Sequence, residues 1–194
     1  GIHLRNIEFT YGSEKSKRII KNLSLEIPAG KTTAIVGLSG SGKTTLIKLM
    51  LGFYPPTDGD VCIGKRSLQK ISFKEWRKHC GVVMQEGFIF GDTIANNIAP
   101  DGEIIDKERM AYAVEMANIR DFIESLPLKY NTKIGNTGQG LSQGQKQRIL
   151  IARAIYRNPD YLFFDEATNA LDTDNEKAIQ QNLDQFFKDK TVVI

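Results

Sequence analysis

Eight residues in the first quarter of the chain have the types and spacing needed to hold a polyphosphate. Gly37-Leu-Ser-Gly-Ser-Gly-Lys-Thr44 fits the pattern G-x-x-x-x-G-K-[ST] at every position. Glycines at this spacing let successive backbone N–H groups turn toward an anion, and the start of a following helix adds its positive dipole end. Lys43 would reach the β- and γ-phosphates, and the Thr44 hydroxyl would hold Mg²⁺. The pattern therefore predicts a phosphate-binding loop, or P-loop, for a nucleoside triphosphate.

The residues on either side of this loop supply the context that the motif needs. The apolar run Thr33–Val36 predicts a buried strand before the loop, and Thr44–Leu51 predicts a helix after it. A strand and a helix in these places separate a P-loop from a chance match, for which the alternative is a glycine-rich turn with no ligand.

Two acidic residues follow a second apolar run. Tyr161–Phe164 predicts a strand buried on both faces, which brings Asp165 and Glu166 to its carboxyl end, where ligands bind in open α/β sheets. Strand alternation points the two acids in different directions, so one can serve Mg²⁺ through water while the other faces the phosphate to be cleaved. The alternative is a strand that ends in two solvated acids, and the P-loop favours the first interpretation.

A second helix start is suited to an anion. In Leu141-Ser-Gln-Gly-Gln145, Ser142 is a candidate N-cap and Gly144 allows close approach of the backbone. A chain with one nucleotide site has no obvious use for two such cradles, so the second could complete the site of another protomer. The alternative is an ordinary serine-capped helix.

The rest of the pattern alternates strands with helices and predicts a mostly parallel α/β sheet. Ile2–Phe9 and Arg18–Ile27 predict an added antiparallel pair, and the strand-free stretch 92–128 predicts an inserted group of helices. The other predicted elements are strands at Asp60–Ile63, Gly81–Met84 and Thr191–Ile194 and helices at 144–156 and 173–187.

Composition excludes several classes of protein. The 194 residues are 41% apolar and 25% charged, as in a soluble globular domain. The net charge of +3 is mild and its cations are dispersed, which argues against a nucleic-acid surface. No signal peptide opens the chain, and no apolar run approaches the roughly 18 residues that span a bilayer. Cys62 and Cys80 lack metal-ligand spacing and predict buried free thiols in a reducing cytosol.

Four motifs, in their order and context, resemble the nucleotide-binding domain of ABC transporters over essentially the whole chain. They are the P-loop, the Leu141–Gln145 signature, the Asp165-Glu166 pair and Asn169-Ala-Leu-Asp172. The residues of two segments, Val83–Ile98 and Leu141–Ala154, resemble the matching segments of exporters. The resemblance is strongest to the bacterial exporters that carry a leader peptidase and secrete bacteriocins or toxins.

The resemblance implies an α/β fold of the P-loop NTPase (RecA-like) type. A mostly parallel sheet core would carry an antiparallel β subdomain and an inserted α-helical subdomain. One ABC ATPase domain would span residues 1–194. Residues 1–85 and 145–194 would form the catalytic core with the β subdomain, and 86–144 the helical subdomain with the signature loop.

The resemblance also implies roles for the matching residues. Tyr11 would stack on adenine, Glu166 would be the general base beside Lys43 and Gln85 as catalytic residues, and Asp172 would be the D-loop aspartate at a dimer interface. Thr137–Gly140 occupies the place of a loop that contacts the membrane domain's coupling helices in exporters. The nucleotide-binding set is Tyr11, Gly37, Ser39, Gly40, Ser41, Gly42, Lys43, Thr44 and Thr45; the signature set, acting in the partner's site, is Leu141, Ser142, Gln143, Gly144 and Gln145; the Mg²⁺ set is Thr44, Gln85 and, through water, Asp165.

These roles predict ATP and Mg²⁺ as cofactors and an ATP-hydrolysing motor of an exporter as the function. A second copy would complete an ATP-sandwich dimer, and a transmembrane domain would bind through its coupling helices at the cytoplasmic face of the cell membrane. The wording favours peptide or protein cargo, and no nucleic-acid partner is expected. One alternative is a soluble ABC-type ATPase that acts on ribosomes or nucleic acid, although the stretch Glu86–Gln143 is too short for the coiled coil common in that class. The other is a non-ABC P-loop kinase, against which the signature argues.

The sequence departs from the family pattern in two places. Gln143 stands where glycine is commonest, a replacement that exporters of this type tolerate. The switch histidine would follow the strand that begins at Thr191, beyond this chain, and His3 and His79 lie in the wrong places to replace it. The domain is therefore expected to be C-terminally incomplete, and turnover by these 194 residues does not follow from the motifs.

Overall fold

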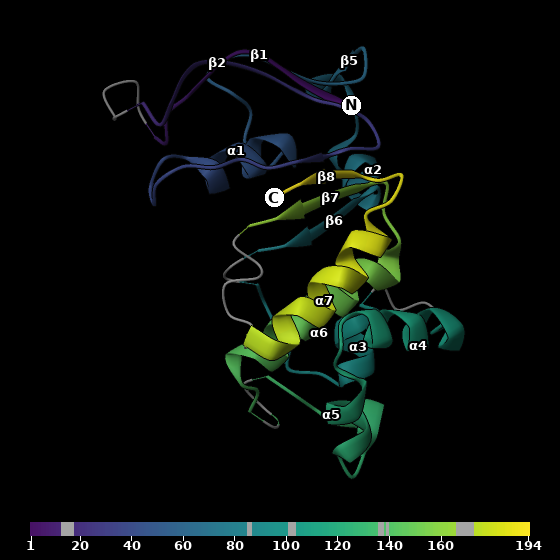
Figure 1. Ribbon diagram of the computed structural model, residues 1–194. Coiled ribbons are helices and arrows are strands. Elements are labelled where there is room, and N and C mark those ends of the chain that lie inside the picture. The colour runs from purple at the N-terminus through teal and green to yellow at the C-terminus, as the bar shows by residue number, and fades with distance from the viewer. Residues whose placement is uncertain (13–17, 85–86, 101–103, 136–137, 139, 166–172) are drawn as a thin grey trace. The chain divides into compact units, whose positions relative to one another are not determined.

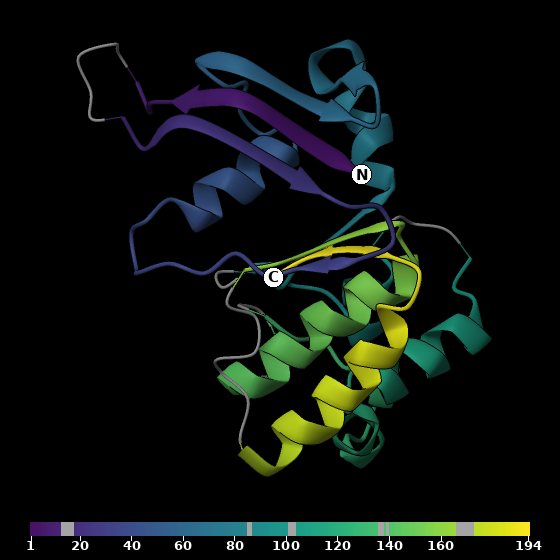
Figure 2. The same ribbon diagram turned by 45° about the horizontal axis from the view of Figure 1, so that its top comes forward.

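The computed structural model describes residues 1–12, 18–84, 87–100, 104–135, 138, 140–165 and 173–194 (Figures 1 and 2). The chain forms two compact units. The first is Gly1–Cys80 with Asp160–Asp165 and Asp189–Ile194, and the second is Gly81–Pro159 with Glu166–Lys188. The division predicted from the motifs, with a helical subdomain over 86–144, stays a prediction.

An antiparallel sheet occupies the first unit and confirms the predicted strand pair. Its order is β2-β1-β4-β5, and its strands are β1 (Ile2–Phe9), β2 (Ile20–Ile27), β4 (Asp58–Ile63) and β5 (Arg66–Ser67). In β1 the buried side chains are Ile2, Leu4, Ile7 and Phe9, so the period of two slips once between Leu4 and Ile7. The pairing with β2 shifts register at the same place, because a bulge there keeps both halves of the strand facing the core.

Parallel strands in the first unit carry the two predicted phosphate motifs. Strand β8 (Thr191–Val193) pairs in parallel with β3 (Thr32–Thr33) and with β7 (Tyr161–Phe164). As predicted, β7 is deeply buried, with Leu162 and Phe163 fully covered. Asp165, the residue after it, is 5% exposed, so the strand delivers this carboxylate into a buried place.

The prediction of a buried strand over Thr33–Val36 is wrong. Strand β3 covers only Thr32–Thr33, and the side chain of Val36 is 92% exposed. The backbone continues beside β8, since Ile35 N donates to the carbonyl of Ile194 at 2.7 Å. Within the described residues, β3 has a partner on one edge only, so the apolar side chains that follow it have no second strand to pack beside.

Helices follow both kinds of strand in the first unit. Helix α1 (Lys43–Met50) follows the P-loop as predicted, and a 3₁₀ turn (Leu68–Lys70) and α2 (Phe73–Lys78) follow the antiparallel sheet. Trp76 is buried in α2 and donates its indole N–H to the Met50 carbonyl at 2.9 Å. This bond anchors the last turn of α1 and hence the turn that follows it.

The second unit is helical over the stretch 92–128, as predicted, and the only strand pairing there among the described residues is an isolated bridge between Thr93 and Lys133. Its elements are β6 (Cys80–Val83), which begins at the last residue of the first unit, α3 (Ile94–Ile98), α4 (Lys107–Met116), α5 (Arg120–Ser125), a 3₁₀ turn (Lys129–Asn131), α6 (Gln143–Arg157) and α7 (Thr173–Phe186). Helix α4 packs against α6, and Asn182 of α7 donates to the Met116 carbonyl at 3.1 Å.

Both cysteines are buried and free, which confirms the expectation of structural thiols. The pKa of the Cys62 thiol is raised, mainly by burial and to a smaller extent by the hydrogen bond to Asp60. No helix in the described ranges combines the length and apolar character that crossing a membrane requires.

The start of α6 confirms Ser142 as its N-cap. The Ser142 hydroxyl accepts from Gln145 N at 3.2 Å, and Ser142 N donates to the Gln145 side-chain oxygen at 2.9 Å. This capping box satisfies two backbone donors that the helix itself leaves unpaired. The helix ends at Arg157, and the C-cap residue Asn158 has a left-handed backbone (φ 46°) and precedes Pro159.

We expect Ser142→Ala to lower the free energy of unfolding by about 1 kcal/mol, because it removes the acceptor of the capping box. Urea unfolding followed by circular dichroism measures the change. Gln143→Ala is the matched control, since Gln143 is exposed and makes no cap bond, and its effect should stay within about 0.5 kcal/mol. Equal losses in the two variants would show that the cap contributes nothing specific.

Candidate functional site

The P-loop turns sharply into helix α1 through two glycines. Gly40 and Gly42 have φ of 77° and 98°, in the left-handed region that disfavours any residue with a Cβ. A Cβ on Gly42 would also lie 3.3 Å from the Ile19 side chain. Gly42 is the N-cap of α1, and no side chain caps this helix, unlike α6. The first turn of α1 therefore presents its N–H groups and positive dipole end without a built-in acceptor.

Lys43 lies against the loop that it would share with a phosphate. Its ammonium donates to the carbonyls of Gly37 at 2.8 Å and Leu38 at 3.3 Å. These two bonds fold the Lys43 side chain back onto the first two residues of the loop. A phosphate oxygen would be a stronger partner, because both members of that hydrogen bond are ionised.

Thr44 meets Asp165, although 121 residues separate them in the chain. The Thr44 hydroxyl donates to an Asp165 carboxylate oxygen at 2.6 Å. The P-loop helix thus lies next to the carboxyl end of β7 within the first unit. A hydroxyl and a carboxylate are oxygen donors of the kind that Mg²⁺ prefers, so the donor set fits the predicted ion.

Tyr11, the predicted adenine contact, lies two residues after β1 and is 39% exposed. Its ring makes perpendicular contacts with Phe9, with centroids 4.8 Å apart, and with Tyr54, at 5.3 Å. Its hydroxyl lies 3.2 Å from the Thr45 hydroxyl in the first turn of α1. The predicted base contact and the predicted phosphate contacts therefore come together around one helix start.

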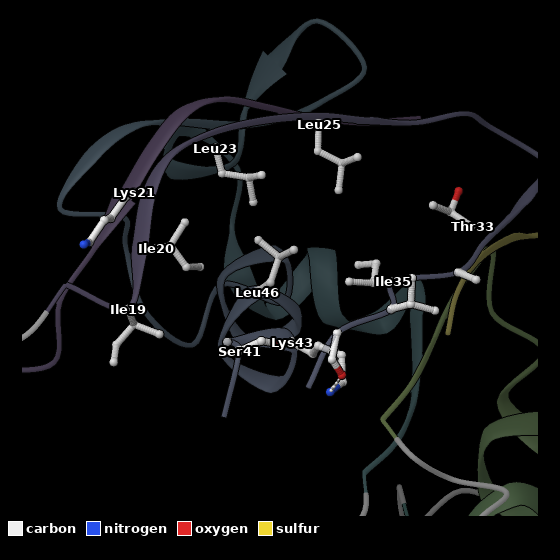
Figure 3. A pocket seen from close by; sticks show the side chains of 14 residues that line it. Ile19, Ile20, Lys21, Leu23, Leu25, Thr33, Ile35, Ser41, Lys43 and Leu46 are labelled. Carbon is white, nitrogen blue, oxygen red and sulfur yellow. Dashed lines mark hydrogen bonds between the residues drawn. The ribbon is translucent and has the colours of Figure 1, made fainter. Parts of the chain in front are cut away.

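An apolar pocket of about 450 Å³ opens beside this loop (Figure 3). Its walls come from β2, from β3 and the segment that leads from it into the P-loop, from the P-loop itself and from α1. Figure 3 shows the aliphatic side chains of Leu23, Leu25, Ile35 and Leu46 around it. P-loop residues, among them Ser41 and Lys43, complete the lining, so the pocket is apolar on one side and offers polar groups on the side of the loop. The predicted phosphate position is on that polar side, because aliphatic walls offer no hydrogen bonds to a polyphosphate.

The signature residues lie in the second unit at the start of α6. Ser142 and Gln143 are exposed, whereas Leu141, Gly144 and Gln145 are half-buried. The Ser142 hydroxyl is used by the capping box, which holds the loop in a fixed shape at the helix start. The role of these residues in another copy's site stays a prediction.

Several predicted residues lie outside the described residues: Gln85, Glu166 and Asp172, together with Asn169 and part of Thr137–Gly140. Their proposed roles rest on the motifs alone.

Arg153 is a half-buried cation of α6 that sequence reasoning did not single out. Its guanidinium donates to the Asn97 carbonyl at 2.6 Å, the Asn97 side-chain oxygen at 3.1 Å and the Phe88 carbonyl at 2.9 Å. Burial, with a smaller contribution from the charge of Arg157, lowers its pKa to about 10, so it remains charged at neutral pH. Asn97 is fully buried and in turn binds both backbone groups of Phe90. Arg153 therefore ties the segment 88–98 to the signature helix.

A sequence profile of the family described as ABC transporter matches residues 20–169. The chain belongs to the ABC transporter family. Its fold is that of an ABC ATPase domain, a P-loop NTPase with one parallel and one antiparallel sheet, which confirms the predicted fold class.

Two relatives and one solved structure illustrate this membership. ATP-binding cassette sub-family B member 5 of Homo sapiens is 42% identical over the whole chain, which covers 15% of that protein. The ATP-dependent lipid A-core flippase of Haemophilus influenzae is 43% identical, again over the whole chain and 33% of its own length. The structure of a bacterial Atm1-family ABC exporter with ATP bound matches with a TM-score of 0.93 and 36% identity, over 99% of this chain and 34% of that one. The chain thus spans about a third or less of each.

Proposed function

We propose that this chain is the motor domain of an ABC exporter, which binds and hydrolyses ATP with Mg²⁺. The contact between the Thr44 hydroxyl and the Asp165 carboxylate, 2.6 Å long and directly beside the P-loop lysine, carries this proposal. It brings two of the three predicted metal residues into contact, next to the residue predicted to hold the phosphates. The ATP-bound state of the similar Atm1-family exporter supports the choice of nucleotide.

In the proposed mechanism, the P-loop amides and Lys43 bind the phosphates. Lys43 exchanges its bonds to the Gly37 and Leu38 carbonyls for charge-assisted bonds to phosphate oxygens. Thr44 and Asp165 would hold Mg²⁺, the latter through water, with Gln85 as a further contact. Bound Mg²⁺ would neutralise charge on the β- and γ-phosphates. Glu166 takes a proton from the attacking water as general base.

The second anion cradle, at Ser142 and Gly144, has no predicted use within its own copy. We infer that two copies bind two ATP molecules head-to-tail, so that this signature loop of one copy closes on the γ-phosphate held by Lys43 of the other. Binding favours the closed pair, and hydrolysis reopens it. Asp172, as the predicted D-loop aspartate, would lie at the interface between the copies.

The dimer would drive an attached or associated transmembrane domain through its coupling helices, at the cytoplasmic face of the membrane. The names of the relatives, which include a lipid A-core flippase and multidrug resistance proteins, support export across a membrane. Peptide or protein cargo rests on the wording of Val83–Ile98 and Leu141–Ala154. No observation favours the alternative of a soluble ATPase that acts on ribosomes or nucleic acid.

The metal site is tested by the Mg²⁺ dependence of ATP binding, measured by calorimetry with Mg²⁺ or with EDTA. Mg²⁺ should raise the affinity for ATP in the wild type, and we expect Thr44→Val to reduce this rise by about 10- to 100-fold. The reason is that the variant replaces an oxygen ligand by a methyl group of the same shape. Thr33→Val is the control, since it also replaces a hydroxyl by a methyl group, but in strand β3 before the P-loop. Equal Mg²⁺ dependence in Thr44→Val and the wild type would contradict the assignment of Thr44.

A further inference from the structure

Tyr54 forms, with Tyr11 and Phe9, a cluster of three rings at the end of β1. Phe9 is 4% exposed and forms the floor, whereas Tyr11 and Tyr54 are 39% and 40% exposed. The planes of both neighbours stand almost perpendicular to the Tyr11 ring, at 86° and 89°. Perpendicular neighbours satisfy the ring quadrupole without occupying Tyr11 in the offset parallel manner that a flat base would use.

The backbone holds these rings in register. Tyr54 lies in the turn after α1, and Thr57, three residues on, donates its N–H to the Glu8 carbonyl at 2.8 Å. The Thr57 hydroxyl accepts from Thr10 N at 3.2 Å. The turn that carries Tyr54 is therefore bonded to the two residues that flank Phe9, directly before Tyr11.

The hydroxyl of Tyr11 supplies a second fixed point. It lies 3.2 Å from the hydroxyl of Thr45, a residue of α1 that is 7% exposed. Thr45 follows Thr44, which bonds to Asp165. The hydroxyl end of Tyr11 thus contacts the helix that would carry the phosphates, and the ring itself packs against Tyr54.

We propose that Tyr54 is a positioning residue for nucleotide binding, which holds the ring of Tyr11 at the angle that receives an adenine. Thr45 sets the distance between that ring and the P-loop through the Tyr11 hydroxyl. This inference rests on the proposed role of Tyr11 in stacking on adenine. It assigns Tyr54, which by sequence is only a turn residue before Pro55, to the base-binding part of the site.

Two probes separate positioning of the base from support of the loop: ATP, and inorganic tripolyphosphate, which lacks the base. We expect Tyr54→Leu in the purified protein to weaken ATP binding about 3- to 10-fold, the size expected when one edge-to-face pair is lost. Tripolyphosphate binding should change by less than about twofold, because the P-loop contacts remain. Tyr54→Phe keeps the ring and should restore ATP binding. Tyr11→Phe should weaken ATP binding alone, since it keeps the ring and removes the bond to Thr45.

Tyr11→Ala separates this inference from the function on which it rests. Loss of stacking should weaken ATP binding about 10-fold or more. If Tyr11→Ala weakens ATP binding and Tyr54→Leu does not, the positioning role of Tyr54 is wrong and the adenine role of Tyr11 stands. If Tyr11→Ala has no effect, the adenine role itself is wrong. Equal losses of ATP and tripolyphosphate in Tyr54→Leu, or no rescue by Tyr54→Phe, would also overturn the proposal, because they indicate general support of the fold.

Discussion

Replacing Lys43 by alanine should lower the affinity for ATP by about 100-fold or more. Each charge-assisted hydrogen bond to a phosphate contributes about 1.5–3 kcal/mol, and the ammonium can donate more than one. Against this gain stands the loss of its bonds to the carbonyls of Gly37 and Leu38, in which only the donor is ionised, so they offset part of the gain. The remaining difference of about 3 kcal/mol corresponds to the stated factor.

Calorimetric titration with MgATP measures the loss, and Lys48→Ala is the matched control. Lys48 lies on the same helix α1 and carries the same charge, but it sits in the last turn and away from the P-loop. Its replacement should change the affinity by less than about threefold, because a cation at that distance acts mainly through a screened field. Unchanged ATP affinity in Lys43→Ala would contradict the P-loop assignment.

The arrangement of the phosphate residues followed from the sequence because each motif includes its own structural context. The P-loop requires a strand before it and a helix after it, and an acidic residue after a buried strand must lie at the carboxyl edge of a sheet. The structure accordingly places the Thr44 hydroxyl on the Asp165 carboxylate. The metal that these two would hold remains a proposal.

Features that depend on what covers a surface did not follow from the sequence. The run Thr33–Val36 reads as buried by its apolar character, yet the described part of the chain supplies one strand neighbour, and Val36 is exposed. Helix α2 was not predicted, because its six residues bury only Trp76 and so carry no helical periodicity. Its start signal, Ser72 accepting from Glu75 N, is readable in the sequence as a capping pattern.

Contacts between distant polar and aromatic side chains were also missed. Arg153 is half-buried and stands between apolar, buried neighbours of α6, and that mismatch is the one signal the sequence offers for it. Its partners, the carbonyls of Phe88 and Asn97, are backbone atoms that no residue pattern encodes. The cluster of Tyr11 and Tyr54 depends on bonds between the end of β1 and the turn after α1, which only the folded chain brings together.

Glu166→Gln should convert the protein from a monomer to a dimer when ATP and Mg²⁺ are saturating. The variant keeps the side-chain size and removes the base that takes a proton from the attacking water, so hydrolysis can no longer reopen the pair. ATP then bridges the P-loop of one copy and the signature loop of the other. Light scattering after size-exclusion chromatography in MgATP should show a doubled molar mass, whereas ADP should leave the monomer.

Two further variants decide whether that dimer is the proposed sandwich. Adding Gly144→Asp to Glu166→Gln places a carboxylate at the second cradle, which should prevent dimerisation through repulsion of the γ-phosphate while ATP affinity stays unchanged. Adding Lys43→Ala should prevent dimerisation by removing ATP itself. Glu26→Gln, which neutralises an exposed acid of β2, should remain monomeric like the wild type. A Glu166→Gln protein that stays monomeric at saturating MgATP would count against the head-to-tail pair, and one that dimerises despite Gly144→Asp would place the interface elsewhere than the signature loop.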